Sequence, residues 1–120
     1  MKLCRIGEIG NEKPALIDDR GRYRDLSTII NDLDPKNINF DTLNKISKIQ
    51  MDSLPEINSN ERIGSCVANP NKFLGIGLNY KDHALEQNLP IPKEPIIFSK
   101  FTSCICGPND DIELPKDSEH

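Results

Sequence analysis

One histidine and one glutamate stand three residues apart in the segment GIGLNYKDHALEQN, which covers residues 75–88. If this segment begins a helix, His83 and Glu86 lie on one face, because residues three apart are neighbours on a helix surface. A carboxylate beside an imidazole can fix the tautomer of the ring, and a neutral, oriented imidazole is what a general base requires. The same spacing is common in solvated surface pairs, so spacing alone favours an ordinary surface pair over a base.

The residues before His83 predict where that helix starts. Asn79 is expected to be the N-cap, with Asp82 three residues later reaching back to the N–H of the cap. Gly75 and Gly77 form a G-x-G pattern, but Tyr80 occupies the position of the third glycine of a dinucleotide-binding turn. A tyrosine there would obstruct close packing of helix and strand, which argues against a nucleotide site. The glycines still leave room for a substrate to approach the backbone.

Metal ligands are poorly represented in the sequence. The acidic and imidazole candidates gather near the end of the chain: Asp110, Asp111, Glu113, Asp117, Glu119 and His120. The run around Asp110 is more typical of a turn. The four cysteines are Cys4, Cys66, Cys104 and Cys106. Cys104 and Cys106 form a C-x-C pair, but no second pair of cysteines has the spacing of a zinc site. The sequence has no secretory context that would favour disulfides, so we expect reduced, half-buried cysteines.

Composition excludes several classes of partner. The 120 residues carry a formal net charge of −4, whereas a protein that binds nucleic acid or an anionic membrane shows a basic patch. No apolar run approaches the roughly 20 residues of a membrane helix, and the N-terminus lacks the apolar core of a signal peptide. We therefore expect a soluble, cytoplasmic protein with no nucleic-acid or membrane partner.

The first half of the sequence predicts a hairpin and a helix. Residues 1–10 and 13–19 resemble two strands, residues 18–23 supply a turn centred on Gly21, and the apolar run 24–30 fits either strand or helix. Residues 39–50 predict a helix with Asn39 as N-cap, a stop near Pro55, and an apolar face that packs on the hairpin. That face consists of Phe40, Leu43, Ile46 and Ile49.

The second half predicts a connector and further strands. Three prolines in residues 89–95 indicate a stiff, extended connector, and strands are expected over residues 95–101 and 111–115. The fold class is therefore α+β, mainly β. We expect a small hairpin-plus-helix domain at 1–67 and the start of a sheet domain at 68–120. The second part has too few strands to close a core of its own, so the chain is expected to be an N-terminal fragment.

Residues 73–115 resemble the start of the catalytic domain of the fumarylacetoacetate hydrolase family. The resemblance lies in the patterns G-x-N-Y-x-x-H-x-x-E, P-x-x-F-x-K and G-x-x-D-x-I-x-x-P, and the preceding residues resemble the small N-terminal domain of bacterial members. It implies a roll of mixed β-sheets, a homodimer, and Mg²⁺ or Mn²⁺ as cofactor. The acidic metal ligands of the family are expected downstream of His120. No metal ligand is expected in these 120 residues, and alone they are expected to be inactive.

The resemblance also implies roles for individual residues. His83 and Glu86 match the water-activating dyad of the acylpyruvate hydrolase branch, and the residues expected to line the substrate site are Gly77, Asn79, Tyr80 and Lys100. The implied reaction is hydrolytic cleavage of a C–C bond in a 2,4-diketo acid, a small 2-oxo acid, with release of pyruvate. The alternatives are a urea-releasing ureidoglycolate lyase or an oxaloacetate decarboxylase of the same family, and a non-catalytic fragment or assembly module.

Overall fold

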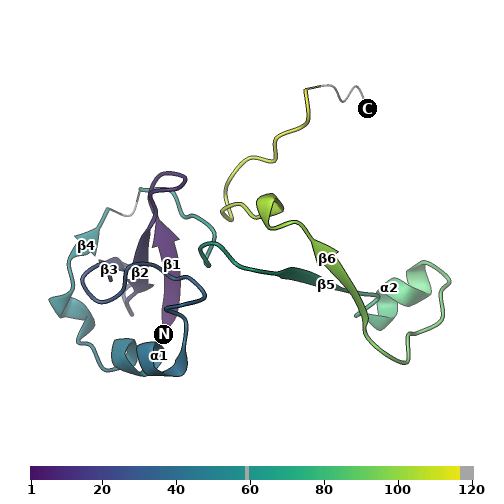
Figure 1. Ribbon diagram of the computed structural model, residues 1–120, viewed down its shortest axis with the longest axis horizontal. Helices are drawn as coiled ribbons and strands as arrows, with labels where there is room; N and C mark the ends of the chain where they lie inside the picture. Colours follow the sequence, from purple (N-terminus) through teal and green to yellow (C-terminus); the bar gives the residue numbers. More distant parts are fainter. Residues whose placement is uncertain (59, 117–120) are drawn as a thin grey trace. The chain divides into compact units, whose positions relative to one another are not determined.

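A computed structural model describes residues 1–58 and 60–116 of the chain, and these residues form two compact units (Figure 1). The first unit contains Met1–Asn69 and the described residues from Cys106 onward, and the second contains Pro70–Ile105. The described residues contain antiparallel sheets and two short α-helices, which confirms the expected α+β, mainly β class. The elements are β1 (Lys2–Ile6), β2 (Lys13–Ile17), β3 (Tyr23–Asp25), α1 (Phe40–Ser47), β4 (Glu56–Ile57), β5 (Phe73–Gly77), α2 (Lys81–Glu86) and β6 (Ile96–Lys100). No helix in this part of the chain has the length and apolar character to cross a bilayer.

The first unit is built on a four-stranded sheet with the order β1-β2-β3-β4. The predicted hairpin is confirmed, since β1 pairs antiparallel with β2 and Cys4 lies opposite Ala15. The turn at Gly21 joins β2 to β3 rather than closing that first hairpin, and its φ of +77° is one that glycine adopts without cost. Residues 24–30 form neither one strand nor a helix. β3 ends at Asp25, whose carboxylate accepts the N–H of Ser27 and turns the chain.

A cluster of buried side chains packs α1 against the sheet of this unit. It consists of the buried side chains Leu16, Leu26, Ile30, Leu33, Ile46 and Leu54. Asn39 caps α1 as predicted, because its side chain accepts the N–H of Thr42 at 2.9 Å. The predicted apolar face is only partly right. Ile46 is buried and Ile49 packs against the core from beyond the helix end, whereas Phe40 is 86% exposed.

α1 is shorter than the sequence predicts. It ends at Ser47, and the N–H groups of Lys48 and Ile49 bond to the carbonyls three residues earlier. Such bonds tighten and terminate a helix, so the chain reaches Pro55 through a separate 3₁₀ turn at Met51–Ser53.

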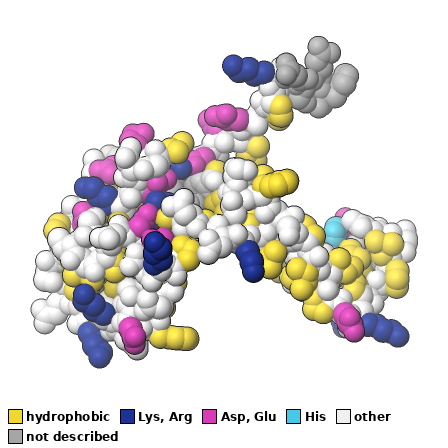
Figure 2. Space-filling view, in the orientation of Figure 1, with side chains coloured by type: hydrophobic (Ala, Val, Ile, Leu, Met, Phe, Trp, Pro, Cys, Tyr) yellow, Lys and Arg dark blue, Asp and Glu magenta, His cyan; other side chains and the backbone are white. Residues whose placement is uncertain are grey.

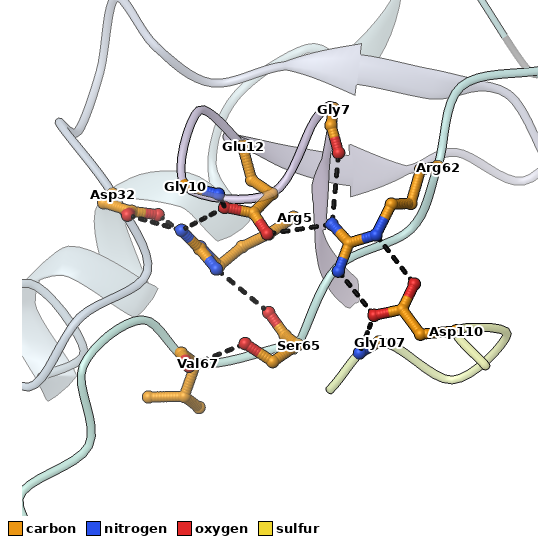
Figure 3. A network of polar contacts seen from close by, with 10 residues as sticks. All are labelled: Arg5, Gly7, Gly10, Glu12, Asp32, Arg62, Ser65, Val67, Gly107 and Asp110. Atoms are coloured by element: carbon orange, nitrogen blue, oxygen red, sulfur yellow. Dashed lines mark hydrogen bonds and ion pairs between the residues drawn. The ribbon is translucent and has the colours of Figure 1, made fainter. Parts of the chain in front are cut away.

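Five charged side chains tie four distant segments of the first unit together (Figure 3). Glu12 accepts hydrogen bonds from both Arg5, at 3.2 Å, and Arg62, at 2.9 Å. Arg5 also donates to both carboxylate oxygens of Asp32, and Arg62 does the same to Asp110. The chain therefore runs Asp32–Arg5–Glu12–Arg62–Asp110, and it holds the turn at residues 107–110 against the N-terminal hairpin.

Lowered carboxyl pKa values make this unit sensitive to acid. Burial raises the pKa of Asp18, but hydrogen bonds from the Arg22 N–H, the Arg24 guanidinium and the Arg20 N–H outweigh it and lower the pKa to about 2. Burial also raises the pKa of Glu12, and its bonds with Arg62 and Arg5 overcome this and hold it below the ordinary value. Hydrogen bonds from Arg62 and the Gly107 N–H lower the pKa of Asp110.

We expect the free energy of unfolding to fall as the pH drops below about 4.5, where carboxyl groups of the unfolded chain begin to take up protons. A group with a lowered folded-state pKa stabilises the fold above its unfolded pKa. That contribution to stability is lost as the pH falls through the pKa of the group in the folded state, which for Asp18 is about 2. Urea denaturation from neutral to acid pH measures the slope, and Asp18→Asn should flatten it. A free energy of unfolding that stays constant into the acid range would contradict the prediction.

The second unit is the antiparallel hairpin β5–β6 with α2 in its connection. A Cβ at Gly75 would overlap the ring of Phe98 on the opposite strand, so this glycine makes room for packing rather than for a ligand. The connector 89–95 has no helix or strand, as predicted. Apolar side chains of β5 and β6, among them Leu74 and Ile97, are exposed (Figure 2).

The strand predicted over residues 111–115 is absent from the described chain. Ile112 and Leu114 are both more than four-fifths exposed, and no neighbouring strand supplies hydrogen bonds to them. An alternating apolar pattern forms a strand only where a partner completes the ladder. The preceding turn is correctly predicted, since the Asp110 carboxylate accepts the N–H of Gly107 at 2.6 Å.

Candidate functional site

The chain leaves β5 through a backbone turn that sets the start of α2. Leu78 has a φ of +46°, in the left-handed region that residues other than glycine rarely adopt. The extended residue Tyr80, not Asn79, is the N-cap, and no side chain caps the helix. The predicted cap at Asn79 is therefore wrong by one residue. The turn at Leu78 delays the helix, so Asp82 lies too early in it to form the expected capping pair.

His83 and Glu86 come together on α2 as the spacing indicates. Nδ1 of His83 lies 3.4 Å from Oε2 of Glu86. The histidine side chain is 51% exposed and that of Glu86 is 79% exposed, so their mutual attraction is screened by water. The contact can orient the imidazole, but it contributes little to the stability of the helix.

Gln87, which lies just beyond the motif that contains His83 and Glu86, also contacts His83. Its side-chain Nε2 lies 3.3 Å from Nε2 of the imidazole. An amide nitrogen only donates, so with the amide in this orientation Nε2 of His83 is the acceptor. Both contacts are compatible with the neutral tautomer in which Nδ1–H donates to Glu86. The signal for Gln87 is its i, i+4 spacing from His83, which places both on one helix face.

The expected substrate-lining residues fall into three places. Gly77 and Asn79 line a hollow of about 310 Å³ between the β5–α2 turn and the connector. Tyr80 is exposed and does not line this hollow. Lys100 lies opposite Phe73 at the other end of the hairpin, about 13 Å along the strand from Gly77 at roughly 3.3 Å per residue. Only Gly77 and Asn79 are thus brought together.

Lys100 is held by aromatic rings. Its Nζ lies 5.4 Å from the centroid of the Phe73 ring and 5.9 Å from that of Phe98. Both distances fit cation–π attraction, which fixes the direction of the side chain without neutralising its charge. Lys100 is therefore available to an anion at this end of the hairpin.

The described residues contain no group of three or more His, Cys, Asp or Glu side chains that could hold a metal ion. Among the acidic candidates, Asp110 is bonded to Arg62 and to the Gly107 N–H, which agrees with a turn rather than a ligand. Asp111 and Glu113 are exposed and make no such cluster. The candidates Asp117, Glu119 and His120 lie outside the described residues.

The four cysteines are free. Cys4 is buried, and burial raises the pKa of its thiol to about 11, so it is not a thiolate nucleophile at neutral pH. The other three are exposed rather than half-buried as predicted. Cys104 ends the 3₁₀ turn Thr102–Cys104.

Comparisons with known proteins point to one family. Residues 72–120 match the family model described as fumarylacetoacetate (FAA) hydrolase C-terminal. A protein of Burkholderia ambifaria with the name "Putative hydrolase" is 49% identical over 118 residues, which are 98% of this chain and 42% of that protein. Similarly named proteins of Burkholderia orbicola and Burkholderia multivorans are 49% and 48% identical over the same shares. The chain thus spans 42% of the length of these curated relatives.

Proposed function

Because this chain belongs to the fumarylacetoacetate hydrolase family, we propose that the protein is a hydrolase that cleaves a C–C bond of a 2,4-diketo acid and releases pyruvate. The observation that carries the proposal is the contact of His83 with Glu86 on α2, inside the segment that matches the family model. The names of the relatives support a hydrolase in general, and the particular substrate is part of the proposal.

In the proposed reaction, His83 is the general base. Its Nε2 takes a proton from water, while Glu86 accepts the Nδ1–H and stabilises the imidazolium that forms. The hydroxide adds to the 4-keto carbon, the C3–C4 bond breaks, and its electron pair passes to C3 as the enolate of pyruvate. A proton on C3 then completes pyruvate, and the acyl part leaves as a carboxylic acid. Gln87 must release Nε2 before water can approach it, because both use the same lone pair.

We propose Mg²⁺ or Mn²⁺ as the cofactor and a homodimer as the assembly, on the family resemblance. A divalent cation acts as a Lewis acid that stabilises an enolate. The described residues do not fit such an ion, since they offer no cluster of ligands.

Glu86→Gln is expected to lower kcat about tenfold while KM changes little, because the substitution weakens control of the tautomer without removing the base. The matched control is Asp82→Asn, which removes an acidic charge from an exposed position of the same helix. A ¹⁵N spectrum of the His83 ring supplies a second readout, in which Glu86→Gln should raise the share of the Nε2–H tautomer. If rate and tautomer both match the wild type, Glu86 does not position the imidazole.

A panel of substrates, supplied to the full-length protein, tests the function itself. Acylpyruvates, ureidoglycolate and oxaloacetate are supplied with Mg²⁺ or Mn²⁺, and pyruvate, urea and CO₂ are measured. The proposal predicts pyruvate and a carboxylic acid in equal amounts from an acylpyruvate, with no urea from ureidoglycolate. Urea release without cleavage of any acylpyruvate would replace the hydrolase with a lyase.

A further inference from the structure

The chain leaves the first unit at one anchored point and returns to it at another. The first unit contains the residues up to Asn69 and resumes at Cys106, so residues 70–105 are joined to it at both ends. At the departure, the N–H of Ala68 donates to the carbonyl of Leu33 at 2.8 Å, and Ala68 is only 3% exposed. Ala68 therefore anchors the chain just before it enters the second unit.

Residues 107–110, the strap, anchor the chain at its return (Figure 3). The Asp110 carboxylate accepts two hydrogen bonds from the Arg62 guanidinium, with Oδ1 at 2.7 Å from Nε, and it also accepts the Gly107 N–H at 2.6 Å. Gly107 is buried, and a Cβ on it would overlap the carbonyl oxygen of Ile63. The side chains of Arg62 and Asp110 are 24% and 17% exposed, so water screens their attraction less than that of a surface pair. Charge and close packing together hold the strap.

Little inside the second unit holds its hairpin together. Among residues 70–105, all of which the structure describes, only Ala84 is buried, and neither core cluster includes any of them. A two-stranded hairpin is at best marginally stable in water by itself. Restriction of its two ends is therefore an important source of stability for β5 and β6.

The two anchors and the hairpin close the same loop. Ile63, against which Gly107 lies, is five residues before Ala68, and an extended chain of that length spans at most about 18 Å. A free coil over residues 69–106 has a root-mean-square end-to-end distance of roughly 35 Å. β5 and β6 pair over their whole lengths, so the hairpin also brings the two ends of this loop together. Because the strap removes freedom that the disordered loop would have, it favours the paired strands.

We propose that the strap controls the order of the β5–β6 hairpin through the contact of Asp110 with Arg62. When this contact is made, the loop 69–106 is closed and the hairpin is ordered. When it opens, the hairpin loosens while the sheet of the first unit persists. The coupling acts in both directions, since an ordered hairpin also favours the closed strap. This device goes beyond the hydrolase function proposed above and does not depend on the reaction.

Hydrogen exchange of the 120-residue chain, measured for each amide by NMR, tests the strap. In the wild type we expect protection of the amides in both strands of the hairpin. Asp110→Ala should lower that protection about three- to tenfold, as expected for the loss of one loop closure. β2 should stay protected, which reports that the first unit remains folded. The matched control is Asp52→Ala, which removes a carboxylate that bonds Arg22 and Arg24 of the first unit and should leave the hairpin unchanged.

Gly75→Ala tests the same coupling from the side of the hairpin. A Cβ at this position would overlap the ring of Phe98, so the substitution weakens the pairing of β5 with β6. Exchange of the Gly107 N–H, which Asp110 accepts, should then become faster. Gly77→Ala is the control on the same strand, because a Cβ there meets its neighbours at ordinary contact distance, and it should leave the Gly107 N–H unchanged.

Unchanged protection of β5 and β6 in Asp110→Ala would overturn the proposal, as would an equal loss in Asp52→Ala or a wild-type hairpin without protection. If Asp110→Ala unfolds the first unit, Gly75→Ala decides. A Gly107 N–H that exchanges at the wild-type rate in Gly75→Ala would then overturn the coupling. Because the readout is amide exchange, these results do not bear on the reaction of diketo acids, and a failure to release pyruvate leaves the strap unaffected.

Discussion

In the full-length protein, His83→Gln is expected to lower kcat on an acylpyruvate by about 10²–10⁴-fold, the usual contribution of a positioned general base. Glutamine keeps a polar side chain of similar reach but has no lone pair that can take a proton from water at neutral pH. The helix should survive, because the side chain is half exposed and its contacts are with Glu86 and Gln87 of the same helix. KM should change little, since the base acts on water rather than on the bound diketo acid.

Asp82→Asn is the matched control for His83→Gln, because it alters the neighbouring exposed residue of α2. It should turn over at the wild-type rate. Circular dichroism and the melting temperature of both variants check that neither has unfolded. Wild-type turnover by His83→Gln would remove His83 from the chemistry and leave the dyad as a surface pair.

Glu12→Ala is expected to lower the free energy of unfolding of the first unit by about 3–5 kcal/mol, the cost of breaking a buried ion pair by removing one partner. The Glu12 carboxylate lies between Arg5 and Arg62, and its side chain is only 6% exposed. Its removal leaves two guanidinium groups close together, each with a single remaining carboxylate partner. It also empties the space beside Gly64, where a Cβ would lie 2.7 Å from Oε1 of Glu12.

Urea denaturation of Glu12→Ala measures this loss, with Glu8→Ala as the control. Glu8 lies in the same loop, is exposed, and makes no ion pair within the described residues. Glu12→Gln separates the charge from the hydrogen bonds, and its stability should fall between wild type and Glu12→Ala. If Glu12→Ala unfolds at the same urea concentration as Glu8→Ala, the network does not hold the unit together.

Local signals in the sequence predict local structure well. Asn39 caps α1 because its side-chain oxygen needs only the N–H of Thr42 three residues later, and both belong to one short segment. The contact of His83 with Glu86 follows equally from the geometry of a single helix. Gln87 follows from the same rule one residue further on, so this contact was accessible to sequence reasoning.

Features that depend on distant residues could not be predicted in this way. Glu12 and Arg62 are fifty residues apart in the sequence, and no local pattern pairs them. The strand expected over 111–115 fails for a related reason, since a strand requires a neighbour that the pattern itself does not supply. The start of α2 shifts by one residue because of the backbone turn at Leu78, and leucine gives no sequence signal for a positive φ.

The resemblance to the family suggests a function for His83 and Glu86, which their spacing alone does not. Helix spacing does not distinguish a general base from a solvated surface pair, and the exposed contact of His83 with Glu86 fits both. Lys100 and Tyr80 are candidates by motif alone, and they lie apart from the hollow that Gly77 and Asn79 line. The division into domains at 1–67 and 68–120 stays a prediction.

Cleavage of an acylpyruvate in ¹⁸O-labelled water, with Mg²⁺ or Mn²⁺ present, tests the proposed reaction most directly. Attack of hydroxide on the 4-keto carbon places one solvent oxygen in the carboxylic acid product, beyond the exchange measured in an enzyme-free control. We expect that label in the acid formed by the wild type, and acid formed about 10²–10⁴-fold more slowly by His83→Gln. Acid without solvent oxygen, or labelled acid formed equally fast by His83→Gln, would contradict water activation by His83.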